Sequence, residues 1–179
     1  GDRGRCQWTA SHPFERSDQW KAWAHLANGS PRTQKQAIEA LEDLAEDIQE
    51  PKAADVVGIL RKLRASVNAS AETELLPDGS TSVAFKKDSK VQGEVSLPPE
   101  ISVQIPVLKG HTEEQGGKRV PVLYRLAVRV RPSIDDAAHL TFRFSMPTAG
   151  RVLEAVYADR VLEAVALLGD DHTLLRAEN

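Results

Sequence analysis

Sulfur-containing residues are nearly absent from this sequence, which has one Cys and one Met in 179 residues. The single thiol, Cys6, excludes a disulfide within the chain and any metal or redox site that needs a pair of cysteines. Because one unpaired thiol fits a reducing compartment, we expect a cytoplasmic protein. The one Met is Met146, and the sequence begins at Gly1 without an initiating Met. We therefore expect further residues upstream and leave open a targeting segment among them.

Long apolar runs and a dominant charge are also missing. No apolar stretch approaches the roughly 18 residues that a membrane-spanning helix needs, so we expect no membrane partner. With 23 basic and 26 acidic residues the formal net charge is -3, which gives no overall field toward nucleic acid. The 41% of hydrophobic residues is typical of a globular protein. The length predicts one domain, which we place at 17–169 between an arm at 1–16 and a tail at 170–179.

The first third of the chain predicts helices within 17–66. Ser17 can cap a helix that runs to about Ala27, and the spacing of Trp20 and Trp23 places both on one stripe of it. That stripe is the first candidate for a buried face.

Two further helices are predicted before the chain changes its periodicity. Thr33 and Gln36 have the spacing of a capping box, and the apolar residues that follow recur every three or four positions up to Ile48. Pro51 suits the first turn of a third helix, whose apolar stripe ends at Leu63.

The middle of the chain, 67–147, alternates apolar and polar residues with the period of a strand. Pro77 and Gly79 predict a turn between the first two strands. Together these patterns predict an α+β fold, in which an antiparallel meander of five or six strands packs with the N-terminal helices and a long C-terminal helix. The predicted strands cover 67–75, 81–85, 91–97, 101–107, 120–130 and 140–146.

The C-terminal helix, predicted at 150–168, contains the same six residues twice. Arg-Val-Leu-Glu-Ala-Val begins at Arg151 and again at Arg160. An offset of nine residues rotates the second copy by roughly 180° on an ideal helix, so the two copies face opposite sides. We therefore expect this helix to be covered on one side by the sheet and on the other by the N-terminal helices or by another subunit.

Five segments follow one another in a characteristic order: the acidic helix 42–51, the turn 76–79, the strands 101–107 and 124–131, and the helix start 151–154. This order resembles the uncharacterised phage and prophage proteins grouped as domain of unknown function 2303, the YfdQ-like family. The resemblance extends from about Trp20 to Gly169. It implies a phage-derived protein inside a bacterial cell, with no established activity and no catalytic residues to transfer.

Motifs of catalysis and metal binding are not found in the sequence. It contains no Gly-x-Ser-x-Gly, no phosphate-binding loop, no His-Glu-x-x-His and no Cys pair, and its five histidines are scattered. We therefore expect no enzyme, no cofactor, no metal and no small-molecule substrate. An enzyme with an unrecognised site is kept as a third hypothesis, which a cleft joining His139 to carboxylates would support.

The stretch from Lys118 to Arg131 is strongly basic and contains no acidic residue. The strand period places its arginines on the face opposite the core, where they could follow the phosphates of a nucleic acid. No aromatic side chain alternates with them, although binders of single strands usually stack bases on such rings. The alternative, which we favour, is that they pair with Glu72, Glu74 or Glu94 of neighbouring strands. The candidate residues are Arg119, Arg125, Arg129, Arg131 and, from the next strand, Arg143.

The hypothesis that we favour is a self-associating, non-enzymatic scaffold or assembly module that forms a homo-oligomer. It follows from the apolar C-terminal helix, the open edges of the meander and the tryptophans near the N-terminus, a residue type that is common where apolar surface meets a partner. The alternative is a nucleic-acid-binding accessory factor in phage replication or recombination. The candidate self-association surface consists of Trp20, Trp23, Val152, Val156, Val161 and Val165.

Overall fold

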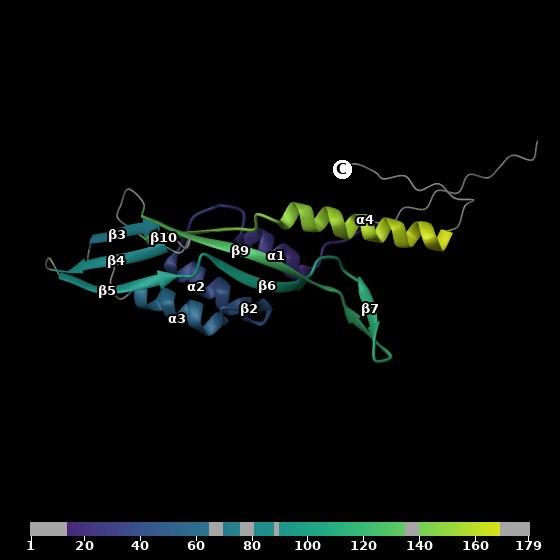
Figure 1. The fold of residues 1–179 in the computed structure, drawn as a ribbon, viewed down its shortest axis with the longest axis horizontal. Coiled ribbons are helices and arrows are strands. Elements are labelled where there is room, and N and C mark those ends of the chain that lie inside the picture. The colour runs from purple at the N-terminus through teal and green to yellow at the C-terminus, as the bar shows by residue number, and fades with distance from the viewer. Residues whose placement is uncertain (1–13, 65–69, 76–80, 88–89, 135–139, 169–179) are drawn as a thin grey trace, which may run out of the picture.

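The computed structural model describes residues 14–64, 70–75, 81–87, 90–134 and 140–168. The predicted α+β class is confirmed: three helices precede most of the strands, and a long helix ends the described chain (Figure 1). The predicted sequence of N-terminal helices, strands and a C-terminal helix is also found, with two short, unpredicted strands between the helices. The helices are α1 (Asp18–Leu26), α2 (Gln34–Asp43), α3 (Ala53–Arg64) and α4 (Ala149–Leu168).

The predicted starts of α1 and α2 are confirmed atom by atom. The backbone N–H of Trp20 donates to Ser17 Oγ at 3.0 Å, which satisfies one of the free donors of the first turn. Thr33 and Gln36 form the reciprocal capping box at the start of α2. The end of α2 differs from the prediction, because the helix stops at Asp43 and Ile48 belongs to a strand.

Residues 14–16, which the sequence assigns to an arm, are attached to the body. Arg16 forms an antiparallel bridge with Leu108, and the backbone N–H of Lys109 donates to the carbonyl of Glu15 at 2.8 Å. The arm therefore contains at most residues 1–13, which lie outside the described residues.

The main sheet has five antiparallel strands in the order β1-β10-β9-β6-β2. Its centre is the meander of β6, β9 and β10 that the alternating pattern predicts, and the two edge strands are short. The strands are β1 (Arg32–Thr33), β2 (Ile48–Glu50), β6 (Glu100–Pro106), β9 (Leu123–Ile134) and β10 (Leu140–Ser145).

The other strands form two smaller sheets, so the predicted meander is divided. Pro98 and Pro99 separate the three-stranded sheet from β6, and proline cannot donate to a ladder. A hairpin that the sequence analysis missed lies between β6 and β9. The turn predicted at Pro77–Gly79 lies outside the described residues. The strands are β3 (Ser70–Leu75), β4 (Thr81–Lys87) and β5 (Lys90–Leu97) in one sheet, and β7 (Thr112–Gln115) and β8 (Lys118–Pro121) in the hairpin.

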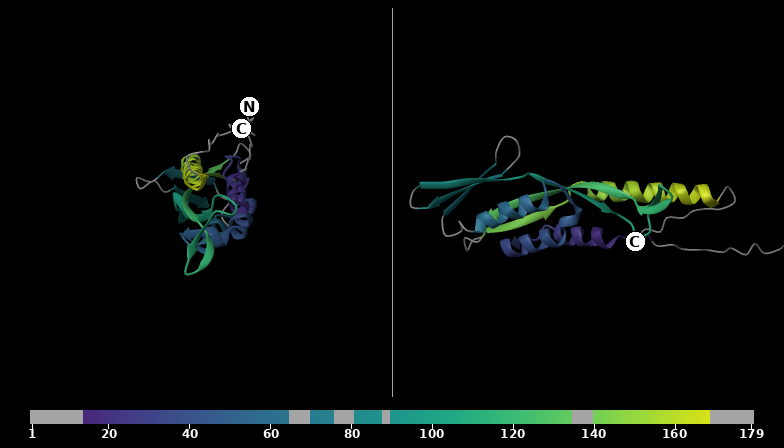
Figure 2. Two further views of the ribbon diagram at one scale, coloured as in Figure 1. Left: turned by 90° about the vertical axis from the view of Figure 1, so that its right-hand side faces the viewer. Right: turned by 90° about the horizontal axis from the view of Figure 1, so that it is seen from below.

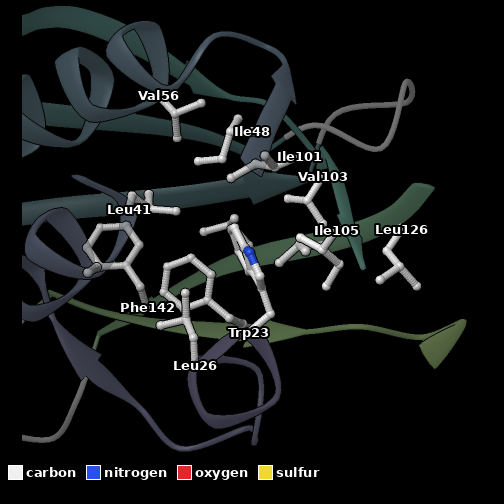
Figure 3. Close-up of a cluster of buried hydrophobic side chains, with 14 of the residues drawn as sticks. Trp23, Leu26, Leu41, Ile48, Val56, Ile101, Val103, Ile105, Leu126 and Phe142 are labelled. Atoms are coloured by element: carbon white, nitrogen blue, oxygen red, sulfur yellow. The ribbon is translucent and has the colours of Figure 1, made fainter. Parts of the chain in front are cut away.

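The hydrophobic core lies between the main sheet and the N-terminal helices. Trp23 is fully buried at its centre, with Leu41 and Phe142 on one side and Ile105 on the other (Figure 3). Alternate residues of the central strands line the same core face, which leaves the opposite face of the sheet to solvent. The strand residues in the core are Ile101, Val103, Ile105, Leu126, Val128, Val130, Leu140, Phe142 and Phe144.

A carboxylate, Asp47, lies at the border of this core. The indole Nε1–H of Trp23 donates to Asp47 Oδ2 at 2.8 Å. Burial raises the pKa of the Asp47 carboxyl, and the Trp23 hydrogen bond only partly opposes this. A carboxyl whose pKa is raised by folding binds its proton more tightly in the folded state. Asp47 therefore lowers stability as the pH rises from about 3.9 through its folded pKa.

We expect Asp47→Asn to remove this pH dependence, because Asn keeps an acceptor for the indole N–H and does not ionise. Urea unfolding between pH 3.5 and pH 7 should give a difference in stability that moves in favour of the variant as the pH rises. Asp43→Asn, at an exposed position of the same segment, controls for the loss of one charge. A difference that is the same at every pH would contradict the account.

Candidate functional site

Four of the five predicted arginines lie together on the solvent face of the main sheet. Leu126, Val128 and Val130 of β9 are buried, so the residues that alternate with them point the other way, as the strand period predicts. All four arginines are exposed. We call this surface the arginine face; it consists of Arg125, Arg129 and Arg131 of β9 and Arg143 of β10.

Arg119 does not belong to the arginine face, and this part of the prediction is wrong. It lies in β8, where it is paired with Glu114 of β7. Gly116 and Gly117, with φ of 59° and 77°, form the tight turn that folds residues 112–121 into a separate hairpin. The hairpin projects from the body beside the end of β6 (Figure 1), so the basic stretch is divided between two sheets.

Two residues of the arginine face have carboxylate partners. Arg129 Nε lies 2.8 Å from Glu100 Oε1 of β6, in the pair that the register makes directly opposite. Arg125 donates from Nε to Ser102 Oγ at 2.6 Å, and a terminal nitrogen of its guanidinium lies 3.5 Å from Glu50 Oε2 of β2. These side chains are exposed, and exposed ion pairs contribute only about 0–1 kcal/mol. An incoming anion can therefore replace either carboxylate.

The carboxylates that pair with the arginines are not those that the sequence suggests. Glu72, Glu74 and Glu94 lie on β3 and β5, which belong to the three-stranded sheet, whereas β9 is flanked by β6 and β10. The side chains of these three residues lie outside the described part of the structure. The prediction therefore named carboxylates on strands that do not flank β9, but it was right that some of the arginines pair with carboxylates.

The other two residues of the arginine face are neighbours of each other. The register of β9 and β10 places Arg131 directly opposite Arg143. Among the described residues no carboxylate forms an ion pair with either of them. Two cations at opposed strand positions destabilise a sheet, because their Cβ atoms lie only about 4.5–5.5 Å apart.

A second candidate surface lies on α4, where the repeated sequence faces two ways as predicted. Val156 in the first copy is fully buried, whereas the matching Val165 in the second copy is 47% exposed. Leu153 packs against the core, and the matching Leu162 is 67% exposed. The second half of α4 extends beyond the main sheet (Figures 1 and 2). We call the exposed residues Ala155, Ala158, Leu162 and Val165 the outer stripe of α4.

Three residues of the predicted self-association surface are not available to a partner. Trp20 is 3% exposed, and Trp23 and Val156 are fully buried within this one chain. Val152 and Val161 are half-buried. The assignments of Trp20, Trp23 and Val156 are wrong because these side chains pack inside the chain. The half-buried Val152 and Val161 stay predictions, and Val165 alone of the group is exposed.

Among the described residues, two titratable side chains, His111 and Tyr124, lie close together. His111 is buried, and its Nδ1 lies 3.5 Å from the hydroxyl of Tyr124, whose pKa is raised by burial and by the nearby carboxylates of Asp159 and Glu163. Within the described ranges, no three His, Cys, Asp or Glu side chains gather as metal ligands do, and no helix is long and apolar enough to cross a membrane. Cys6 and His139 lie outside those ranges.

No protein-family model, no curated protein and no solved structure matches this chain. The resemblance to the phage and prophage family therefore stays an expectation.

Proposed function

We propose that this protein is a non-enzymatic self-associating module, in which the outer stripe of α4 packs against the same stripe of a second copy. The observation that carries the proposal is the exposure of Leu162 and Val165, at 67% and 47%, on a helix end that extends beyond the sheet. A helix draws most of its stability from packing an apolar face, and the described residues offer the outer stripe of this half of α4 little to pack against.

The spacing of the outer stripe favours another helix as the partner. Ala155, Ala158, Leu162 and Val165 follow one another at intervals of three, four and three residues, which is the spacing of a coiled-coil seam. Such a seam is buried by a second helix that crosses at a small angle.

The sizes of these side chains favour a second copy in antiparallel orientation. The two small residues, Ala155 and Ala158, occupy one end of the stripe, and the two large ones occupy the other. In an antiparallel pair Ala158 lies against Leu162 of the second copy and Ala155 against Val165, so small and large side chains interdigitate in each layer. The arrangement has two-fold symmetry, which is the commonest symmetry of soluble oligomers.

We expect the wild-type protein to self-associate at tens of micromolar in sedimentation equilibrium, and Leu162→Glu/Val165→Glu to be monomeric. Burial of two such side chains contributes roughly 3–5 kcal/mol, so the variant should associate at least about 100-fold more weakly. Gln49→Glu/Gln115→Glu adds the same two charges at exposed positions outside α4 and should leave association unchanged.

A wild-type protein that is monomeric at these concentrations would contradict the proposal. So would association that the control variant weakens as much as the α4 variant, since the effect would then come from net charge rather than from the outer stripe.

A further inference from the structure

The pair formed by Arg131 and Arg143 is the least explained feature of the sheet. The two residues lie directly opposite each other on β9 and β10, both exposed, and no carboxylate of the described chain forms an ion pair with either. Neighbouring positions of the same strands carry Ser133 and Thr141, which hydrogen-bond to each other across the ladder at 2.9 Å. Two residues away on each strand the sheet thus carries an uncharged, hydrogen-bonded pair, whereas Arg131 and Arg143 repel each other in the free protein.

An anion between the two guanidinium groups would remove this repulsion. Each guanidinium presents a rigid, planar set of donors that matches two oxygens of a phosphate, and the charge never titrates. Two such groups at opposed positions can hold oxygens of one phosphate from both sides. Arg129 and Arg125 extend the positive charge along β9, because a rise of about 3.3 Å per residue places Arg125 roughly 20 Å from Arg131.

The surroundings of these residues are suited to a nucleic acid rather than to a protein. Between the arginines the face carries small or polar residues: Ser102, Gln104, Ala127 and Ser145. Protein interfaces depend on large apolar or aromatic anchors at their centre, and the described residues between the arginines include none, since the exposed Leu123 lies at the end of the face. Among the described residues of the face there is also no aromatic ring on which a base can stack, so the contacts are to phosphates rather than to bases.

We propose that the arginine face binds the phosphate backbone of nucleic acid without regard to sequence, and that Arg131 and Arg143 jointly hold one phosphate group. Arg125 and Arg129 exchange Glu50 and Glu100 for further phosphates when the nucleic acid binds. These residues are distinct from the outer stripe of α4, so the inference does not depend on the proposed function.

The test is a titration of the full chain against a labelled 20-base-pair DNA duplex of mixed sequence, followed by fluorescence anisotropy at 50–200 mM salt. Each phosphate contact contributes about 0.9 to the slope of log K against log salt, so the three phosphates held by the four arginines predict a slope of about -2.7. Arg131→Gln/Arg143→Gln should bind at least about tenfold more weakly at the lowest salt and lose about 1 from the slope, because the pair holds one phosphate. A second duplex of different sequence should bind equally well.

The matched control is Arg61→Gln/Arg151→Gln, which removes two exposed arginines outside the arginine face. It should retain most of the slope and affinity. Urea unfolding separates a binding role from a structural one: the Arg131/Arg143 variant should unfold at the same or a higher urea concentration than the wild type, because repulsion between the arginines is removed.

Several outcomes would overturn the proposal. The first is the absence of duplex binding at 50 mM salt with tens of micromolar protein. The second is an equal loss of binding in the control variant, which would indicate a diffuse charge effect. Displacement of the duplex by inorganic phosphate at the same phosphate concentration would assign a site for free phosphate instead, and displacement by poly-glutamate at equal charge would assign an acidic protein partner.

Discussion

Replacing Trp23 with Ala should lower the free energy of unfolding by about 3–5 kcal/mol, the range for removing a large aromatic side chain from a core. Trp23 is fully buried between the main sheet and α2, in contact with the cluster that includes Leu41, Ile105 and Phe142 (Figure 3). The substitution leaves a cavity and also removes the N–H that donates to Asp47. Urea unfolding followed by far-ultraviolet circular dichroism measures the change.

Trp23→Phe is the matched control, because it keeps most of the ring volume and removes only the indole N–H. It should lower the free energy of unfolding by clearly less than Trp23→Ala does. If Trp23 were instead part of a contact between copies, Trp23→Ala would weaken self-association and leave the unfolding of the monomer unchanged. That result would contradict the burial seen here and would restore the prediction made from the sequence.

The tryptophans show why a preference of residue type is weaker evidence than periodicity. Trp is common at interfaces, and this suggested a partner surface near the N-terminus. The same sequence placed Trp20 and Trp23 on one stripe with Leu26, which is the pattern of a helix that packs on its own core. All three residues are buried. The local pattern was the better guide because it depends on geometry within one helix.

The starts of the helices could be predicted from sequence, whereas strands that depend on distant pairing could not. Ser17 and Thr33 act on donors within three residues, so their capping role is visible locally. Ile48 continues the apolar period of α2, yet it lies in β2 and pairs with Val103 of β6. That pairing joins residues far apart in the chain and overrides the local preference for a helix.

The hairpin of β7 and β8 was missed for a different reason. Gly116 and Gly117 supply the two positive φ values of a tight turn, and this signal is present in the sequence. The flanking strands are exposed except at the half-buried Val120, and β7 shows no apolar alternation, so the pattern that identifies a pair of strands is absent. A search for two adjacent glycines between polar segments would have found the hairpin and would have placed Arg119 outside the arginine face.

The alternation along β9 correctly predicted which arginines share a face, but the way they pair required the register. Sequence gives the side of the sheet on which Arg131 lies, and only the pairing with β10 places it opposite Arg143. The carboxylates of Glu50 and Glu100 likewise meet the arginines through β2 and β6. The feature that carries the nucleic-acid proposal is therefore one that a single sequence cannot show.

The two copies of the repeat in α4 allow a test in which the same substitution should strongly destabilise the protein at one position and hardly at all at the other. Val156→Asp should lower the free energy of unfolding by more than about 4 kcal/mol, because it replaces a fully buried valine with a charge that has no partner in the core. Val165→Asp, at the matching position of the second copy, should change the stability of the monomer by about 0.5 kcal/mol or less. Unfolding in urea at low protein concentration measures both without a contribution from association.

The dependence of the thermal midpoint on protein concentration should then distinguish Val165→Asp from the wild type. Association that occurs only in the folded state raises the thermal midpoint as the concentration increases. The wild-type midpoint should therefore rise between 1 and 100 micromolar, and that of Val165→Asp should stay constant, because its charge lies in the seam between two copies. If both midpoints rise together, the outer stripe is not where the copies meet, even though Val156 still identifies the inner face of the same helix.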